Sequence, residues 1–378
     1  MRIAVLTRRY GYNFGSSLQA CAMRLMLESL GHQVTILNYD EFSQHLAWKV
    51  KPMLRSLAIP CLNVCYKLGI ITHMVEASMM EKCQKANFDE FDKRHIKPTK
   101  TVFHTQRALS EAVKGFDACV CGSDQIWNPN SYDTHYYLDF CSREIIRKVS
   151  YGASFGVSRI DDPHRRISAM LDDFSHLSVR ETDGQRIVEK LTGRKDCSVV
   201  LDPTLMIPAS IWKKMKDVYK ARLPECYVAC YFLGNTYIPH EWIKRVSEFL
   251  KCPVVTLTTF RPRNNIEGIQ LGNLGPLEFL DVIDNASCVL TDSFQATVFS
   301  ILFRKNFYTF DKHKKDSSVN ENSSLYTLLQ KLNLGNRHIE VNEVGCFSYQ
   351  TIAYDNVKEL LENERRHSLD FLIKSLAE

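Results

Sequence analysis

Polar side chains suited to holding an anion follow the apolar runs of the sequence that are typical of buried strands. The clearest case is the junction where the run 289–291 breaks at Asp292-Ser293 and passes directly into an apolar helix. Such a junction directs unpaired backbone N–H groups toward a ligand above the sheet, and it therefore favours an anion. Ligands of open parallel sheets bind beyond the carboxyl ends of the strands, so the loops after the other apolar runs supply further candidates.

These candidates are rich in arginine, hydroxyl and amide groups, which suit an anion and a sugar. In the first half of the chain they are Arg8, Arg9, Asn13, Ser123, Asp124, Gln125, Ser154, Arg180 and Glu181. In the second half they are Gly234, Asn235, Arg261, Arg263, Ser293 and Gln295. Structural alternatives stay open at this stage: the arginines could be solvated loop charge or internal ion pairs, and the turn 122–124 could cap a helix.

The motifs of several common enzyme classes do not occur in the sequence. It contains no Walker A sequence, no G-x-G-x-x-G after the first apolar run, no H-E-x-x-H and no G-x-S-x-G. The 12 histidines are scattered without the spacing of metal ligands, so we expect no metal site. From the residues alone we infer a two-domain α/β protein that binds an anionic or sugar ligand between its domains.

Length and composition indicate a globular protein with two domains. A single hydrophobic core rarely grows past about 250–300 residues, and this chain has 378. The net charge of +5 is spread along the chain, which argues against a nucleic-acid partner. The 13 cysteines form no C-x-x-C pair, so we expect buried, reduced thiols. Those expected inside strands are Cys119, Cys121, Cys226, Cys230 and Cys288.

The sequence also carries expectations about the cellular compartment. The chain enters an apolar strand at residue 2, so we expect no signal peptide and a cytoplasmic protein. The most apolar window, 54–75, is interrupted by Pro60, Lys67 and Gly69, which excludes a spanning helix. Two alternatives remain for this window: a buried helix pair, or an amphipathic segment that touches the inner face of a membrane.

Alternating strand and helix patterns predict parallel sheets in both halves. Strands are predicted at 2–7, 33–39, 116–121, 148–153, 177–180, 199–203, 226–233, 254–258, 288–291 and 306–310. Helices are predicted at 18–30, 106–114, 164–174, 184–191, 211–219, 240–250, 277–285, 295–303, 325–332 and 354–376, the first of them capped by Ser16 or Ser17. Residues 40–100 are expected to form an irregular helical insert, and 311–324 a mobile loop. The predicted organisation is an N-terminal domain at 1–205, a C-terminal domain at 206–350, and a closing helix within 351–378 that packs back on the first domain.

Several short segments occur in a characteristic order along the chain. The segment 122–129 reads Gly-Ser-Asp-Gln-Ile-Trp-Asn-Pro, and the others are 13–20, 150–156, 178–181, 200–204, 231–234, 275–280 and 291–294. Taken together, this ordered set resembles the polysaccharide pyruvyl transferase family over about residues 3–335. The resemblance implies two Rossmann-like domains that face a cleft, in the glycosyltransferase-B manner.

The resemblance also implies an activity. Enzymes of this family transfer the enolpyruvyl carbons of phosphoenolpyruvate to a sugar of a cell-surface polysaccharide or its precursor, forming a ketal and releasing phosphate. The implied partners are phosphoenolpyruvate and a saccharide acceptor, free or lipid-linked, with no metal or nucleotide cofactor. The N-terminal domain would hold the acceptor and the C-terminal domain the donor. Oligomeric state is not indicated.

Roles for the candidate residues follow from the resemblance. The donor would be held by Arg180, Ser293, Phe294, Arg261 and Arg263, with Arg8, Asn13, Ser123, Asp124, Gln125, Ser154 and Gly234 elsewhere in the cleft. Gln295 stands where the family's common pattern has histidine, and an amide cannot shuttle a proton. Glu181 is the first alternative for proton transfer. Relatives also place an arginine near 322–325, which here reads Asn-Ser-Ser-Leu. Two other functions therefore stay open: a weak or inactive homologue that binds a glycan or phosphorylated ligand, and a glycosyltransferase that uses a sugar nucleotide.

Overall fold

The computed structural model describes residues 1–9, 11–41, 83–216, 223–234, 238–258, 266–312, 322–340 and 348–377. Several sequence predictions lie outside these ranges. They are the apolar window 54–75 and most of the insert 40–100, most of the loop 311–324, and the candidate residues Asn235, Arg261 and Arg263.

The first half of the chain forms a five-stranded parallel sheet in the order β3-β2-β1-β4-β5. Its strands are β1 (Arg2–Leu6), β2 (Gln33–Tyr39), β3 (Pro98–Phe103), β4 (Ala118–Cys121) and β5 (Arg147–Ser150). The accompanying helices are α1 (Phe14–Ser29), α4 (Gln106–Ala112), α5 (Arg166–Asp172) and α6 (Thr182–Thr192). Two short strands, β6 (Ser178–Val179) and β7 (Ser198–Val199), pair in parallel beside β5.

The second half forms a six-stranded parallel sheet in the order β10-β9-β8-β11-β12-β13. Its strands are β8 (Val228–Tyr231), β9 (Val254–Leu257), β10 (Ile269–Leu271), β11 (Cys288–Thr291), β12 (Asn306–Phe310) and β13 (His338–Ile339). Its helices are α8 (Ala209–Met215), α9 (His240–Leu250), α10 (Pro276–Asn285), α11 (Phe294–Leu302) and α12 (Ser323–Lys331). The short α7 (Pro203–Met206) links the halves, and α13 (Tyr354–Ala377) closes the chain.

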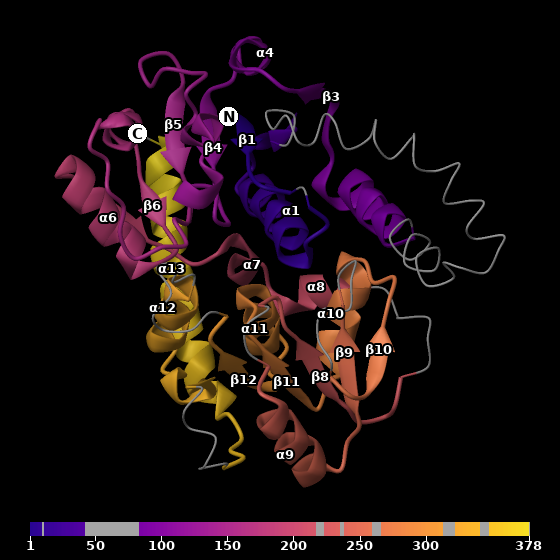
Figure 1. Ribbon diagram of the computed structural model, residues 1–378. Helices are drawn as coiled ribbons and strands as arrows, with labels where there is room; N and C mark the ends of the chain where they lie inside the picture. The colour runs from indigo at the N-terminus through magenta and orange to yellow at the C-terminus, as the bar shows by residue number, and fades with distance from the viewer. Residues whose placement is uncertain are drawn as a thin grey trace, which may run out of the picture.

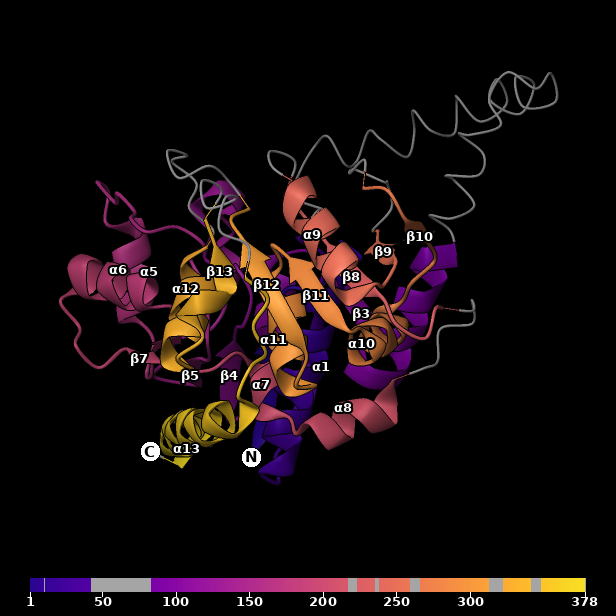
Figure 2. The same ribbon diagram turned by 90° about the horizontal axis from the view of Figure 1, so that it is seen from below.

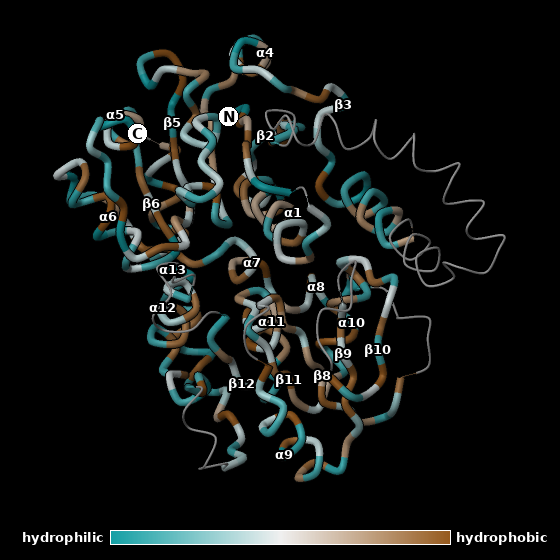
Figure 3. The backbone as a smooth tube through the Cα atoms, viewed as in Figure 1, coloured by the Kyte–Doolittle hydropathy of each residue, from teal (hydrophilic) through white to brown (hydrophobic). Residues whose placement is uncertain are grey.

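The fold class predicted from the sequence is confirmed: two parallel α/β sheets with their own helices face each other (Figures 1 and 2). Hydrophobic residues recur along the strands of both sheets, as a buried parallel sheet requires (Figure 3). The edge strands β3, β10 and β13 were not predicted. Their exposed and polar residues weaken the apolar signal that marks a central strand; Ile269, for example, is 42% exposed.

Aromatic packing joins the two halves. Phe14 of α1 stacks on Phe279 of α10 with ring centroids 4.7 Å apart, and it also contacts Tyr231 of β8. All three side chains are buried, so one continuous core runs beneath both domains. A tightly packed aromatic interface of this kind fixes the position of one sheet relative to the other. A site made from both halves requires this.

The closing helix α13 contacts both halves of the protein. Its first residue, Tyr354, donates from its hydroxyl to the backbone oxygen of Ser300 in α11. Farther along, Ser368 accepts from the N–H of Leu201, and Arg147 of β5 donates to the carbonyl of Leu376. The yellow helix in Figure 1 follows this path between the domains. Among the described residues we find no helix with the length and apolar character needed to cross a bilayer.

Candidate active site

A cavity of about 710 Å³ lies where the carboxyl ends of strands from both sheets meet. Its lining from the first half is Arg8, Gly11, Asn13, Gly15, Ser16, Glu41, Asp124, Gln125, Ser131, Tyr132, Asp133, Thr134, His135 and Arg180. Its lining from the second half is Leu233, Asp292, Ser293, Phe294, Gln295, Lys312, Asn322, Ser324 and Leu325. A volume of this size accommodates two small substrates side by side.

Two helix N-termini converge on this cavity. Helix α1 begins four residues earlier than predicted because Asn13, rather than Ser16 or Ser17, is its cap, accepting from the N–H groups of Gly15 and Ser16. Helix α11 is capped by Ser293, whose hydroxyl accepts from the N–H of Ala296. The dipoles of both helix starts therefore favour negative charge at this point.

Gly15 allows the two helix starts to approach closely. A Cβ atom at this position would lie 3.1 Å from Cβ of Gln295 and 3.1 Å from Oδ1 of Asn13, and nearer still to Cγ of Gln295. Any larger residue at position 15 would thus push directly on the side chain of Gln295.

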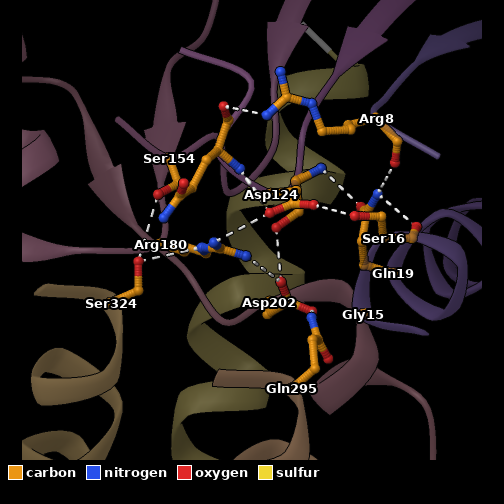
Figure 4. Close-up of polar contacts among 12 residues, drawn as sticks. Arg8, Gly15, Ser16, Gln19, Asp124, Ser154, Arg180, Asp202, Gln295 and Ser324 are labelled. Carbon is orange, nitrogen blue, oxygen red and sulfur yellow. Dashed lines mark hydrogen bonds and ion pairs between the residues drawn. The ribbon is translucent and has the colours of Figure 1, made fainter. Parts of the chain in front are cut away.

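Arg180 lies at the centre of the polar contacts beneath the cavity (Figure 4). It follows β6, and its side chain is 5% exposed. Its Nη1 donates to Oδ2 of Asp202 at 3.1 Å, and its Nε donates to the hydroxyl of Ser324 at 3.3 Å. The guanidinium also lies 4.7 Å above the ring of Phe294, the first residue of α11. This cation therefore links strand β6 of one half to helix α11 and helix α12 of the other.

Asp202 is the carboxylate that organises the floor of the site. It is 1% exposed, and it accepts from Arg180, from the hydroxyl of Ser123 at 2.7 Å, and from the N–H and hydroxyl of Thr204. Nε2 of Gln295 donates to Oδ1 of Asp202 at 3.3 Å. The Gln295 amide is thus oriented by Asp202, with its other face on the cavity.

Glu181 does not reach the cavity. It is fully buried, and its two oxygens accept from the N–H of Phe155 at 2.7 Å and the hydroxyl of Ser324 at 2.8 Å. Burial raises the pKa of this carboxyl, although Arg180 and these hydrogen bonds act in the opposite direction. The sequence-based assignment of Glu181 to proton transfer gains no support from this position, which suits a group that orients Arg180 and Ser324.

Asp124 and Asp292 are among the carboxyl groups that do line the cavity. Burial raises the pKa of Asp292, which accepts from the N–H groups of Leu233 and Gly234, both at 2.7 Å. Burial also acts to raise the pKa of Asp124, but Arg180, Arg8 and a hydrogen bond from Ser16 outweigh it and keep that pKa below its ordinary value. Asp124 is therefore an anion that partly balances the cations beside it.

The positive charge in the cavity is compensated. Three described cations line it, namely Arg8, Arg180 and Lys312, and four carboxyl groups do so as well, namely Glu41, Asp124, Asp133 and Asp292. Arg8 pairs with Glu41 at 3.1 Å, as Arg180 pairs with Asp202. The expected surplus of arginine charge is thus absent from the described lining, and the helix starts supply much of its attraction for an anion.

The structure brings most of the sequence-predicted site residues together. Those that line the cavity are Arg8, Asn13, Asp124, Gln125, Arg180, Ser293, Phe294 and Gln295. Those that lie behind the lining as supports are Ser123, Ser154, Glu181 and Gly234. Arg9 does not face the cavity lining and instead pairs with Asp92 at 2.6 Å. Arg261 and Arg263 lie outside the described residues.

Sequence reasoning missed several residues of the site. Asp202 was read as part of a strand, whereas it caps α7, and Ser324 was noted only as standing near an expected arginine. The aromatic and polar segment 131–135 also lines the cavity, and none of its residues was among the candidates. Asp133-Thr134-His135 carried a usable signal, because an aspartate two residues before a histidine is a natural cap and ion-pair partner. Among the described residues, no group of three or more His, Cys, Asp or Glu is arranged to hold a metal ion.

Solved structures with similar folds are distant in sequence. A putative UDP-N-acetylglucosamine 2-epimerase from Listeria monocytogenes superposes with a TM-score of 0.50 at 10% identity, over 98% of this chain and 90% of its own. UDP-GlcNAc 2-epimerase from Neisseria meningitidis gives 0.48 at 9% identity, over 99% and 100%. The E. coli ADP-heptose LPS heptosyltransferase II gives 0.38 at 8%, over 97% and 99%. The first likeness supports the glycosyltransferase-B-like fold alone.

Comparison with curated proteins found no match. A family model does match, and it covers residues 13–313, a span that holds all strands of the two facing sheets except β1 and β13, and all the ordered segments from Asn13 to Phe294. By this match over most of its length, with two opposed parallel sheets and a cavity at their facing edges, the chain belongs to the polysaccharide pyruvyl transferase family.

Proposed function

We propose that this protein transfers a pyruvyl group from phosphoenolpyruvate to a saccharide acceptor, with ketal formation and release of phosphate. The observation that carries the proposal is the meeting of Arg180 with the N-terminus of α11: the guanidinium lies 4.7 Å over Phe294, beside the cap Ser293. A cation and a helix start together suit a compact ligand that carries both a phosphate and a carboxylate.

The two halves suit different substrates. The second half contributes the start of α11 and Lys312, which favour the anionic donor. The first half contributes hydroxyl, amide and aromatic groups, among them Gln125, Ser131 and Tyr132, which favour a sugar. The acceptor, free or lipid-linked, would therefore bind on the N-terminal side. We further propose that the reaction uses no metal or nucleotide cofactor and takes place in the cytoplasm.

Thermal unfolding with added ligand tests the donor. At a phosphoenolpyruvate concentration ten times Kd, binding stabilises the native state by about 1.4 kcal/mol, which raises Tm by about 2 °C for a chain of this length. Arg180→Ala is expected to abolish the rise, and Arg186→Ala, whose side chain is 72% exposed, is expected to keep it. No rise at millimolar phosphoenolpyruvate would contradict the proposal.

A second ligand separates the proposal from its main competitor. The Listeria monocytogenes protein of similar fold is described as a putative UDP-N-acetylglucosamine 2-epimerase, so a sugar nucleotide is the competing ligand to test. A Tm rise with UDP-GlcNAc and none with phosphoenolpyruvate would favour a sugar-nucleotide enzyme. A rise with phosphoenolpyruvate but no phosphate release with any acceptor saccharide would favour a binding protein in place of a transferase.

A further inference from the structure

Proton transfer in the proposed reaction lacks an obvious residue. The amide of Gln295 cannot exchange a proton in this role, and Glu181 is sealed behind the lining. Asp124 accepts from Ser16 and Gln125 and lies 3.6 Å from Arg180, while Asp292 is held by two backbone N–H groups. These carboxyl groups are committed to structural hydrogen bonds, so a different group is needed.

His135 lines the same cavity from the first half of the chain. It lies in the 3-10 turn η4 (Thr134–Tyr137), which is capped by Asp133. Its side chain is 10% exposed, and its Nε2 is buried without a hydrogen-bond partner within the described parts of the chain. Several buried side-chain atoms of the described residues lack a hydrogen-bond partner. Among these atoms, Nε2 of His135 is the one that belongs to a residue lining the cavity.

Two residues, Asp133 and Tyr39, orient the imidazole. Oδ1 of Asp133 lies 2.8 Å from Nδ1 of His135 and also accepts from its backbone N–H at 3.0 Å. Oδ2 of Asp133 accepts from the hydroxyl of Tyr39 at 2.7 Å, and the Tyr39 ring stacks on the imidazole with centroids 5.0 Å apart. The Asp133 oxygens are acceptors, so Nδ1 carries a proton and Nε2 is the nitrogen left without a partner among the described residues.

We propose that His135, held by Asp133 and Tyr39, is the catalytic acid–base residue of the pyruvyl transfer. This inference rests on the proposed function. A histidine whose one nitrogen is fixed by a carboxylate and whose other nitrogen is unpaired has the arrangement that proton transfer requires. Tyr132, which is 43% exposed and lines the cavity beside it, offers an aromatic surface for the apolar face of a sugar ring.

The charges around His135 favour its protonated form. Burial acts to lower the pKa of His135, but the hydrogen bond with Asp133 and the charges of Asp133 and Asp139 outweigh it and raise that pKa above its ordinary value. The charged or titratable groups that face the ring are therefore Asp133, Asp139 and Tyr39. A raised pKa favours the imidazolium form of His135, whose Nε2 proton the first step of the reaction uses.

The proton movements balance without another reactant. The imidazolium gives its Nε2 proton to the methylene carbon of phosphoenolpyruvate, whose π electrons form the new C–H bond and leave a cationic centre at C2. The first acceptor hydroxyl bonds to C2, and its proton returns to Nε2. The C–O bond to phosphate then breaks with its electron pair, the second hydroxyl closes the ketal, and its proton leaves with the phosphate.

His135→Gln separates chemistry from binding. The variant is expected to lose at least about 100-fold in kcat, the usual contribution of general acid–base catalysis, while phosphoenolpyruvate still raises its Tm as in the wild type. The matched control His367→Gln, on the exposed side of α13, is expected to keep wild-type turnover. Turnover by His135→Gln within threefold of the wild type would overturn the inference.

Asp133→Asn tests the inference through the pH profile of activity, which would not change if His135 had a purely structural role. The imidazolium must be present for the first step, so activity falls as pH rises through the pKa of His135. Loss of the Asp133 charge is expected to move this alkaline limb of kcat/KM to lower pH by about one pH unit. An unmoved limb would overturn the inference, and this variant decides alone if His135→Gln does not fold. Absence of wild-type turnover with phosphoenolpyruvate and every acceptor would remove the proposed function as well, so the two failures are distinguishable.

Discussion

The close approach of helices α1 and α11 makes a sharp prediction for Gly15. Alanine at this position brings its Cβ to 3.1 Å from Cβ of Gln295 and nearer still to Cγ, so the Gln295 side chain must move. Because that side chain donates to Asp202 at 3.3 Å, the displacement is expected to disturb the hydrogen bonds around Asp202 as well as the packing.

The size of the effect follows from two opposing terms. Overpacking a filled site costs about 1–3 kcal/mol, and replacing glycine in a helix returns about 0.5–1 kcal/mol. We therefore expect Gly15→Ala to lower the free energy of unfolding by about 1–2 kcal/mol. In a Gln295→Ala background the obstructing atoms beyond Cβ are gone, and the same change should lie within about 0.5 kcal/mol of neutral.

Urea unfolding of the two single variants and the double variant measures the coupling free energy between positions 15 and 295. Gly335→Ala is the control, since a Cβ there meets no atom within 4 Å. The reasoning is refuted if Gly15→Ala costs the same free energy with and without the Gln295 side chain. In the wild-type background, Gly15→Ala should also reduce the Tm rise caused by phosphoenolpyruvate.

Three further predictions concern charge in the site. Arg180→Ala leaves buried carboxylates without their cation, and it should lower the free energy of unfolding in urea by about 3–5 kcal/mol. The exposed control Arg186→Ala should lower it by at most about 0.5 kcal/mol. Equal losses would contradict the buried network. Gln295→His should not raise turnover, since proton transfer is assigned to His135, and a tenfold gain in kcat would contradict that assignment. The carboxylate of Asp202 should raise the pKa of the new imidazole, which an NMR titration measures. The pKa of Asp124 is lowered on folding, so its stabilisation is present above its unfolded pKa and is lost as pH falls through its folded pKa. The wild-type unfolding free energy should therefore fall more steeply than that of Asp124→Asn below about pH 5, by up to about 1.4 kcal/mol per pH unit, and parallel profiles would refute it.

The fold could be predicted from the sequence because its signal is local. Apolar runs such as Cys288–Thr291, followed at once by a helix, mark central parallel strands wherever they occur. The same locality placed Ser293 and Gln295 at the start of a helix and indicated an anion site there. Edge strands such as β10 were not predicted, because their solvated residues interrupt the apolar pattern.

The partners of each site residue could not be predicted in this way. Arg180 was expected to hold the donor, with an internal ion pair as the alternative. It is paired with Asp202, which lies 22 positions along the chain, and bonded to Ser324, which lies 144 positions away. Glu181, its neighbour in sequence, points behind the lining because the N–H of Phe155 and the hydroxyl of Ser324 hold it there. Adjacent residues of an extended segment face opposite sides, so proximity in sequence does not place both in the cavity.

The sequence by itself therefore determined the two parallel sheets, the order of the family's segments and the polar residue types at the carboxyl ends of the strands. Only the tertiary structure decided which of those residues share a cavity, that carboxylates balance its arginines, and that Tyr39, Asp133 and His135 meet at its edge. The physical reason is the range of the interactions. Strand and helix patterns depend on neighbours a few residues apart, whereas the site depends on contacts such as Tyr39 with Asp133, 94 residues apart, which the packing of the sheets alone creates.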